Sequence, residues 1–148
     1  MARTPSSVLF ACSMNSIRSP MAEAILKHLH GRRLYVDSVG VRAAEVDGFA
    51  VAAMDEIGID IARHRPKTFE ELEDTSYDLV ISLSPEAQHR AVELTRTMDC
   101  EVEFWPVLDP TIVVEGSREE RLEAYRQVRD HLMGRIVERF PAFPRSTV

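Results

Sequence analysis

The stretch VLFACSMNSIRSPMAEA, residues 8–24, combines three features in a fixed order. A short, almost continuous apolar run ends at Cys12, which is one of two cysteines in the chain. Five residues separate Cys12 from Arg18, and Ser19-Pro20 then begins a segment with apolar residues at helical spacing. Apolar runs of this kind are typical of central strands in a sheet covered on both faces. The stretch therefore predicts a strand, a loop and a helix in succession.

Three further segments are predicted as strands, namely residues 34–39, 77–83 and 100–105. The last of them alternates apolar and acidic side chains, a pattern that suits an edge strand. Helices are predicted to begin at four capping residues, Ser19, Asp47, Thr68 and Ser117. Because strands alternate with helices along the chain, the sequence predicts a parallel, right-handed α/β sheet.

Length and composition narrow the functional classes. The 148 residues suffice for one domain, 1–148, with its own core. A net charge of −6 without a lysine- or arginine-rich block argues against nucleic-acid binding. No apolar stretch could span a bilayer, and two distant cysteines form no disulfide framework, so we expect a cytoplasmic protein without membrane contact. The five histidines lack metal-ligand spacing, so we expect them mostly in solvent and predict no metal and no cofactor.

The loop after Cys12 has the properties of an anion site. Ligands of parallel α/β sheets bind beyond the carboxyl ends of the strands, where Cys12 is placed. Backbone N–H groups of the loop and of the first helical turn can surround a tetrahedral anion, and the helix N-terminus favours a thiolate. Arg18 can bind two oxygens with its planar guanidinium. A buried structural cysteine beside an arginine that pairs with a carboxylate is the alternative reading.

The same residues carry a family resemblance. The strand, Cys12, Asn15 at the third loop position and the run Arg18–Glu23 resemble the signature of the low-molecular-weight protein tyrosine phosphatases. Weaker similarity continues through DSVG (37–40), IGID (57–60) and the segment near His64 to WPVLDP (105–110). The resemblance implies a single-domain, four-stranded parallel sheet in the order 2-1-3-4 with helices on both faces. It also implies a phosphatase that forms a phosphocysteine intermediate and acts on a phosphorylated protein, with phosphotyrosine the expected residue.

By this resemblance the catalytic residues are Cys12 as nucleophile, Arg18 as phosphate ligand and Asp109 as general acid and then general base. Taken alone, Asp109 could equally belong to an ordinary Asp-Pro turn. Ser19 would stabilise the thiolate, and Asn15 would hold the shape of the loop because asparagine tolerates left-handed backbone angles. The predicted phosphate-binding residues are Ser13, Met14, Asn15, Ser16, Ile17, Arg18 and Ser19.

Several positions depart from the usual pattern of the family. Ile17 stands where many members have a second cysteine, and Thr111 and Ile112 stand where tyrosine-specific members place aromatic rings. Ser13 is a small hydroxyl residue, whereas phosphoarginine-type relatives have a threonine there and tyrosine-type members a larger apolar residue. Two alternatives therefore stay open: a phosphoarginine-type phosphatase and a glutathione-coupled arsenate reductase. A thioredoxin-coupled reductase would need two more cysteines after the third strand, where this chain has serines.

Overall fold

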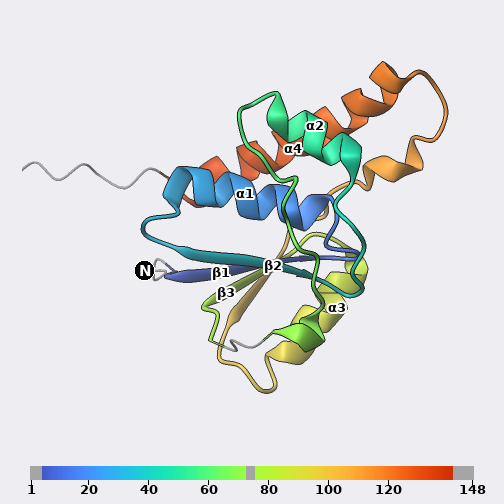
Figure 1. Cartoon of the computed structure of the whole chain (residues 1–148). Coiled ribbons are helices and arrows are strands. Elements are labelled where there is room, and N and C mark those ends of the chain that lie inside the picture. Colours follow the sequence, from blue (N-terminus) through green and yellow to red (C-terminus); the bar gives the residue numbers. More distant parts are fainter. Residues whose placement is uncertain (1–4, 73–75, 142–148) are drawn as a thin grey trace, which may run out of the picture.

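A computed structural model of the protein describes residues 5–72 and 76–141 (Figure 1). Four parallel strands form one sheet in the order β2-β1-β3-β4. Their bounds are β1 Ser7–Cys12, β2 Tyr35–Gly40, β3 Leu79–Ser82 and β4 Glu101–Phe104. The predicted fold class and strand order are confirmed, and β4 is an edge strand as expected. Each predicted strand differs from the observed one by one or two residues at its ends.

Helices cover both faces of the sheet (Figure 1). Their bounds are α1 Arg18–His30, α2 Gly48–Asp55, α3 Pro85–Leu94 and α4 Arg118–Arg139, with short 3-10 helices η1 Phe69–Glu71 and η2 Pro110–Ile112. Val8 and Phe10 of β1 pack in the core beneath α1, α2 and α4, whereas Leu9 and Ala11 pack in the core on the α3 side. This two-sided burial explains the continuous apolar run. None of the described helices is long and apolar enough to cross a bilayer.

The structure corrects three expectations about helices. Ser19 is not an N-cap, because α1 already begins at Arg18 and the Ser19 hydroxyl lies against Cys12. The capping box at Thr68 exists, but it starts only the single turn η1. Helix α3 was not predicted, although Ser84 caps it by accepting a hydrogen bond from the Ala87 N–H at 3.3 Å. Predicted caps at Asp47 and Ser117 are confirmed.

Ion pairs join α2 to α4. Glu56, directly after α2, accepts hydrogen bonds from the guanidinium groups of Arg126 at 2.7–3.0 Å and Arg129 at 2.9 Å. These bonds, the one from Arg126 first, lower the pKa of Glu56 to about 2. Because the pKa of Glu56 in the folded protein lies below its unfolded value of 4.5, the pairs stabilise the fold above about pH 4.5. Their contribution is lost as the pH falls toward 2.

We therefore expect Glu56→Gln to lower the melting temperature at pH 7 by about 1–3 °C, a small change because the pair is exposed. At pH 3 the difference from the parent protein should shrink. Thermal unfolding followed by circular dichroism at both pH values tests this. Glu119→Gln is the control: within the described residues Glu119 pairs with Arg126 and with no second arginine, and it is more exposed, so its effect should be smaller. An equal loss from Glu56→Gln at pH 7 and pH 3 would contradict the assignment.

Candidate active site

The carbonyl groups of the loop after β1 face the segment that follows β2. Four backbone hydrogen bonds of 2.8–3.0 Å join them: Val41 N to Cys12 O, Arg42 N to Ser13 O, Ala44 N to Met14 O and Asp47 N to Ser16 O. No cis peptide occurs in the described chain, so the N–H group of each of these peptides points the opposite way. The N–H groups of Ser13, Met14, Asn15 and Ile17 therefore face the inside of the loop. That of Asn15 lies 3.3 Å from Cys12 Sγ.

Asn15 controls the shape of this loop. Its φ is +53°, and it is the one non-glycine residue with positive φ in the described chain. The Asn15 Nδ2 group donates to Ser19 Oγ at 2.8 Å and to Ser38 Oγ at 3.0 Å. Its Oδ1 accepts from His64 Nε2 at 3.0 Å and from Lys67 N at 2.9 Å. All four hydrogen-bonding positions of the buried amide are thus occupied.

Cys12 lies at the bottom of the loop and is only 2 % exposed. Its Sγ atom is 2.9 Å from Ser19 Oγ. Ser19 Oγ accepts a hydrogen bond from Asn15, and its own proton has two acceptors in reach, Cys12 Sγ at 2.9 Å and Val39 O at 3.4 Å, of which the sulfur is nearer. The Asn15 N–H also points at the sulfur, so the loop backbone and the Ser19 hydroxyl both lie within hydrogen-bonding distance of Cys12 Sγ. These contacts support the prediction that Cys12 is a nucleophile, and the residue also packs against the core beneath α1.

Arg18 connects the loop to the segment after β4. This first residue of α1 is buried, and its Nη1 donates to Val107 O at 3.0 Å. One bond fixes the guanidinium, and its remaining N–H groups can serve an anion in the loop. In the alternative reading Arg18 would pair with a carboxylate, but no such ion pair is found among the described residues. The geometry favours the anion-binding role.

Asp109 lies two residues beyond Val107, at the carboxyl end of β4. It caps η2, and its Oδ1 accepts hydrogen bonds from Thr111 N at 2.9 Å and Thr111 Oγ1 at 2.7 Å. Both bonds use Oδ1, and no hydrogen bond to Oδ2 is found within the described part of the chain. The segment that holds Asp109 is joined to Arg18 by the Val107 carbonyl, as described above. The structure thus brings Asp109 to the same edge of the sheet as Cys12.

The other predicted loop residues differ in exposure. Asn15, Ser16, Ile17 and Ser19 are buried, and Ile17 belongs to the core under α1. Ser13 and Met14 are partly exposed at the mouth of the loop. Ser13 Oγ donates to Ser84 Oγ at 3.1 Å, so the start of α3 also borders the site. No cluster of three or more possible metal ligands occurs among the described residues.

A polar chain behind Asn15 was missed by sequence analysis. Ser38 Oγ donates to Glu23 Oε1 at 2.5 Å, and His64 Nδ1 lies 4.0 Å from the same oxygen. Our expectation that the histidines mostly face solvent is wrong for His64, whose side chain is 10 % exposed. Burial lowers the pKa of His64, against the opposing effect of Glu23. A neutral His64 with its proton on Nε2 can donate to Asn15 Oδ1.

Comparison with known proteins assigns this chain to a family. A family model described as low molecular weight phosphotyrosine protein phosphatase matches residues 7–140. The chain belongs to this family. The arsenate reductase of Halalkalibacterium halodurans is 37% identical over 130 residues, which are 87% of this chain and 91% of that protein.

Two solved structures of phosphatases are similar to the structure of this chain. The low molecular weight protein tyrosine phosphatase of T. tengcongensis has a TM-score of 0.72 and 28% identity, covering 90% of this chain and 99% of that one. The arginine phosphatase YwlE, in a form whose active-site serine is phosphorylated, has a TM-score of 0.68 and 25% identity, covering 91% and 97%. Family membership supports a cysteine-based phosphatase or reductase, while the roles of individual residues stay predictions.

Gly40, at the end of β2, is a further residue that this phosphatase-family loop requires. A Cβ atom at this position would lie 2.3 Å from Arg42 O and 2.7 Å from Asn15 N. Both neighbours are backbone atoms of the site, so neither can rotate away. Sequence analysis quoted Gly40 only within the DSVG similarity, and a glycine at the carboxyl end of a strand was the available signal.

We predict that Gly40→Ala displaces the loop and weakens phosphate binding by at least about tenfold. Gly134→Ala is the matched control, because this glycine lies inside α4 with nothing within 4 Å of an added Cβ. The control should bind phosphate as the parent does and unfold at the same or a higher temperature. Isothermal titration calorimetry with inorganic phosphate measures the affinity. Unchanged affinity in Gly40→Ala would contradict the prediction.

Proposed function

We propose that the protein is a cytoplasmic phosphatase that hydrolyses phosphomonoesters of proteins through a phosphocysteine intermediate. The observation that supports this proposal is the loop itself, whose N–H groups face inward toward Cys12 Sγ and whose last residue is followed by Arg18, a buried arginine with further N–H groups for an anion. A tetrahedral oxyanion bound there would have its central atom next to the sulfur. The two free cysteines are compatible with a reducing compartment.

The mechanism follows from these positions. Cys12 Sγ attacks phosphorus and forms a sulfur–phosphorus bond, while the bond from phosphorus to the leaving oxygen breaks and Asp109 protonates that oxygen. Arg18 and the loop N–H groups stabilise the charge on the equatorial oxygens. Asp109 then takes a proton from water, whose oxygen attacks phosphorus. The sulfur leaves as a thiolate that accepts the hydrogen bond from Ser19.

Apolar side chains around Asp109 support an organic substrate. Leu108 is 64% and Ile112 is 62% exposed on the segment that carries the acid. Such residues can pack against the carbon part of a phosphorylated side chain, which bare phosphate or arsenate lacks. We infer phosphotyrosine as the preferred residue, with aliphatic groups in place of aromatic walls. Phosphoarginine is the alternative, supported by the small Ser13 and by the similarity to an arginine phosphatase.

Arsenate reduction is a second candidate because the chain resembles arsenate reductases. Cys12 would displace water from arsenate to form a sulfur–arsenic bond. A second thiol would then attack Cys12 Sγ, form a disulfide and leave the bonding electron pair on arsenic, which becomes arsenite. Ser84 borders the loop, but it carries a hydroxyl. Cys100 precedes β4 at the amino end of the sheet, roughly 15 Å along the strand direction from Cys12. The second thiol must therefore be external, such as glutathione.

The deciding experiment compares the two activities of one preparation. We expect metal-free hydrolysis of para-nitrophenyl phosphate, and arsenite formation from arsenate that is at least about a hundredfold slower even with glutathione, since no relay thiol is present. Cys12→Ser should abolish turnover and still bind phosphate, because a serine hydroxyl is not ionised there. Efficient glutathione-dependent arsenite formation without phosphate ester hydrolysis would replace the proposal by the second candidate.

A further prediction distinguishes two possible roles of Asp109, that of a general acid and that of a structural turn residue. Asp109→Asn keeps the cap of η2, because the amide oxygen can still accept the Thr111 bonds. Turnover of phenyl phosphate, a poor leaving group, should fall by about 10²–10⁴-fold. Turnover of para-nitrophenyl phosphate should fall much less, because its leaving group needs little protonation. Equal losses on both substrates would assign Asp109 to the turn alone.

A further inference from the structure

A pair of arginines at the start of α4 lies against one phenylalanine ring. The guanidinium carbons of Arg118 and Arg121 are 5.4 Å and 4.9 Å from the centroid of the Phe49 ring. We call Arg118, Arg121 and Phe49 the arginine cluster. Arg118 is exposed, and the other two residues are partly buried. Cation–π contacts of this kind orient a guanidinium while leaving its N–H edge available.

The arginine cluster differs from the paired arginines elsewhere in the molecule. Within the described residues, neither Arg118 nor Arg121 forms an ion pair, although the chain has 24 acidic residues. The Nε atom of Arg121 is buried without a hydrogen-bond partner. A buried donor that is left unpaired is uncommon. The glutamates of the same turn, Glu119 and Glu120, bond to Arg126 and to Ser117 N instead. The guanidinium groups of Arg118 and Arg121 therefore remain available to an external anion. Other arginines, among them Arg42, Arg90, Arg126, Arg129 and Arg139, do pair with carboxylates.

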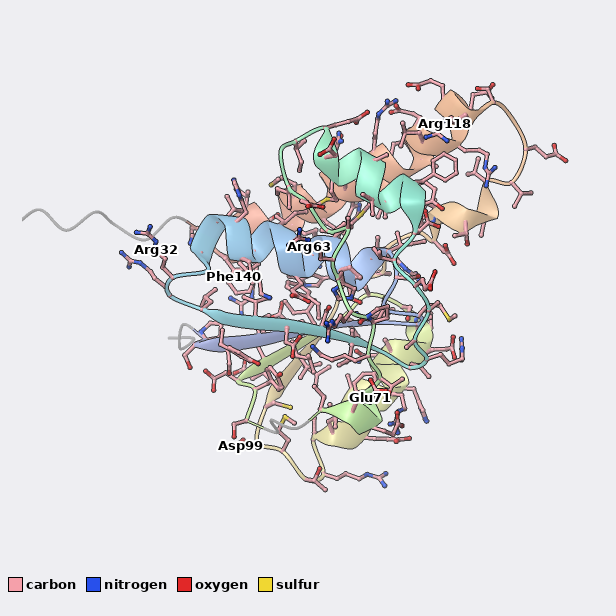
Figure 2. All side chains as sticks on the ribbon, viewed as in Figure 1. Arg32, Arg63, Glu71, Asp99, Arg118 and Phe140 are labelled. Carbon is pink, nitrogen blue, oxygen red and sulfur yellow. The ribbon has the colours of Figure 1, made fainter. Side chains whose placement is uncertain are left out.

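Contacts connect the arginine cluster to the catalytic loop. The Phe49 ring stacks on Tyr125 with centroids 5.2 Å apart, and the Tyr125 hydroxyl donates to Asp47 Oδ2 at 3.1 Å. The Asp47 N–H in turn donates to Ser16 O of the loop. Figure 2 shows Arg118 where α4 begins, at the upper right, and Arg32 on the other side of the molecule, at the left. The cluster therefore adjoins the site through Tyr125 and Asp47.

Among the described residues, the carboxylate of Asp47 forms no ion pair with Arg118 or Arg121 and bonds to other groups. Its Oδ1 accepts from Phe49 N at 2.7 Å and from Ala50 N at 3.3 Å, and its Oδ2 accepts from Tyr125. These bonds commit both oxygens to the start of α2 and to the Tyr125 hydroxyl. Asp47 and Tyr125 also separate the cluster from the phosphate position, so a small phosphate ester cannot occupy both. A polypeptide advances about 3.3 Å per residue and can bridge the two sites.

We propose that Arg118 and Arg121 bind a carboxylate of the phosphoprotein substrate, so that the enzyme prefers phosphorylated residues with an aspartate or glutamate nearby. This inference rests on the proposed phosphatase function. Each arginine can donate two N–H groups to a carboxylate. Contact with the Phe49 ring already restricts the two arginine side chains, so they lose less conformational entropy when a carboxylate binds. The arginine cluster would recognise an acidic residue near the phosphorylated residue, without affecting the reaction at Cys12.

The test uses a phosphotyrosine peptide with flanking glutamates and its counterpart with glutamines. The variant Arg118→Ala/Arg121→Ala removes both guanidinium groups. We expect its KM for the glutamate peptide to rise about tenfold with kcat unchanged. The KM values for the glutamine peptide and for para-nitrophenyl phosphate should change less than about twofold, which would also show that the active site is intact. Added salt should reduce the preference of the parent enzyme for the glutamate peptide.

Two controls separate charge recognition from folding. Arg32→Ala/Arg96→Ala removes two exposed arginines elsewhere and should leave the glutamate preference intact. Arg118→Lys/Arg121→Lys keeps the charge and should recover part of the preference. A parent enzyme without glutamate preference, or a preference that survives in Arg118→Ala/Arg121→Ala, would overturn the inference. So would equal losses on both peptides and on para-nitrophenyl phosphate, which would make the cluster structural.

A binding measurement keeps this test independent of the proposed reaction. Fluorescence anisotropy on the Cys12→Ser background gives the affinity for each labelled peptide without turnover. If the Cys12→Ser protein prefers the glutamate peptide and loses that preference when the Arg118 and Arg121 substitutions are added, the result supports the arginine cluster. This conclusion holds even if the parent enzyme hydrolyses neither peptide, an outcome that would refute only the proposed phosphatase function. Equal affinities for both peptides on the Cys12→Ser background would refute the cluster while leaving phosphatase activity untouched.

Discussion

The saturated amide of Asn15 holds the loop on which the whole site depends. A left-handed backbone at a non-glycine residue costs about 1–2 kcal/mol, and Asn15 has a φ of +53°. Four hydrogen bonds to its side chain, each contributing about 1 kcal/mol net, exceed that cost. They come from α1, β2 and the segment 64–67, so the turn closes only when these elements have assembled. The loop is therefore a product of the tertiary fold rather than of local preference.

The reversal at Asn15 separates the two sides of the loop backbone. Carbonyl groups turn outward to the N–H groups of the segment 41–47, and the N–H groups turn inward toward Cys12. That arrangement requires the segment after β2 to approach the loop closely, which Gly40 permits because it has no Cβ. A parallel sheet supplies the rest, since the carboxyl ends of β1 and β4 bring Cys12 and Asp109 to one edge.

Features with a strong local signal could be predicted from the sequence, and features made by distant contacts could not. The apolar run before Cys12 identified a central strand because both of its faces are buried. The Ser19-Pro20 pair misled us, because it has the pattern of an N-cap while the hydroxyl of Ser19 serves Cys12. Ser38 lies within the DSVG similarity and His64 within a weakly similar segment, but neither had a predicted role, since that role exists only where β2 and the segment 64–67 meet Asn15. The Asp109 position followed from strand order, but its hydrogen bonds with Thr111 did not.

The same loop can lead to two reactions, and a second thiol decides between them. Phosphorus has no accessible lower oxidation state under these conditions, so a phosphocysteine can only pass its phosphoryl group to water. An arsenic adduct on Cys12 can instead accept two electrons when another thiol attacks the sulfur. Ser84 borders the loop through its hydrogen bond with Ser13, and its hydroxyl cannot perform that attack. The residues of this chain can by themselves support hydrolysis of the intermediate, with assistance from Asp109, whereas reduction requires a thiol from another molecule.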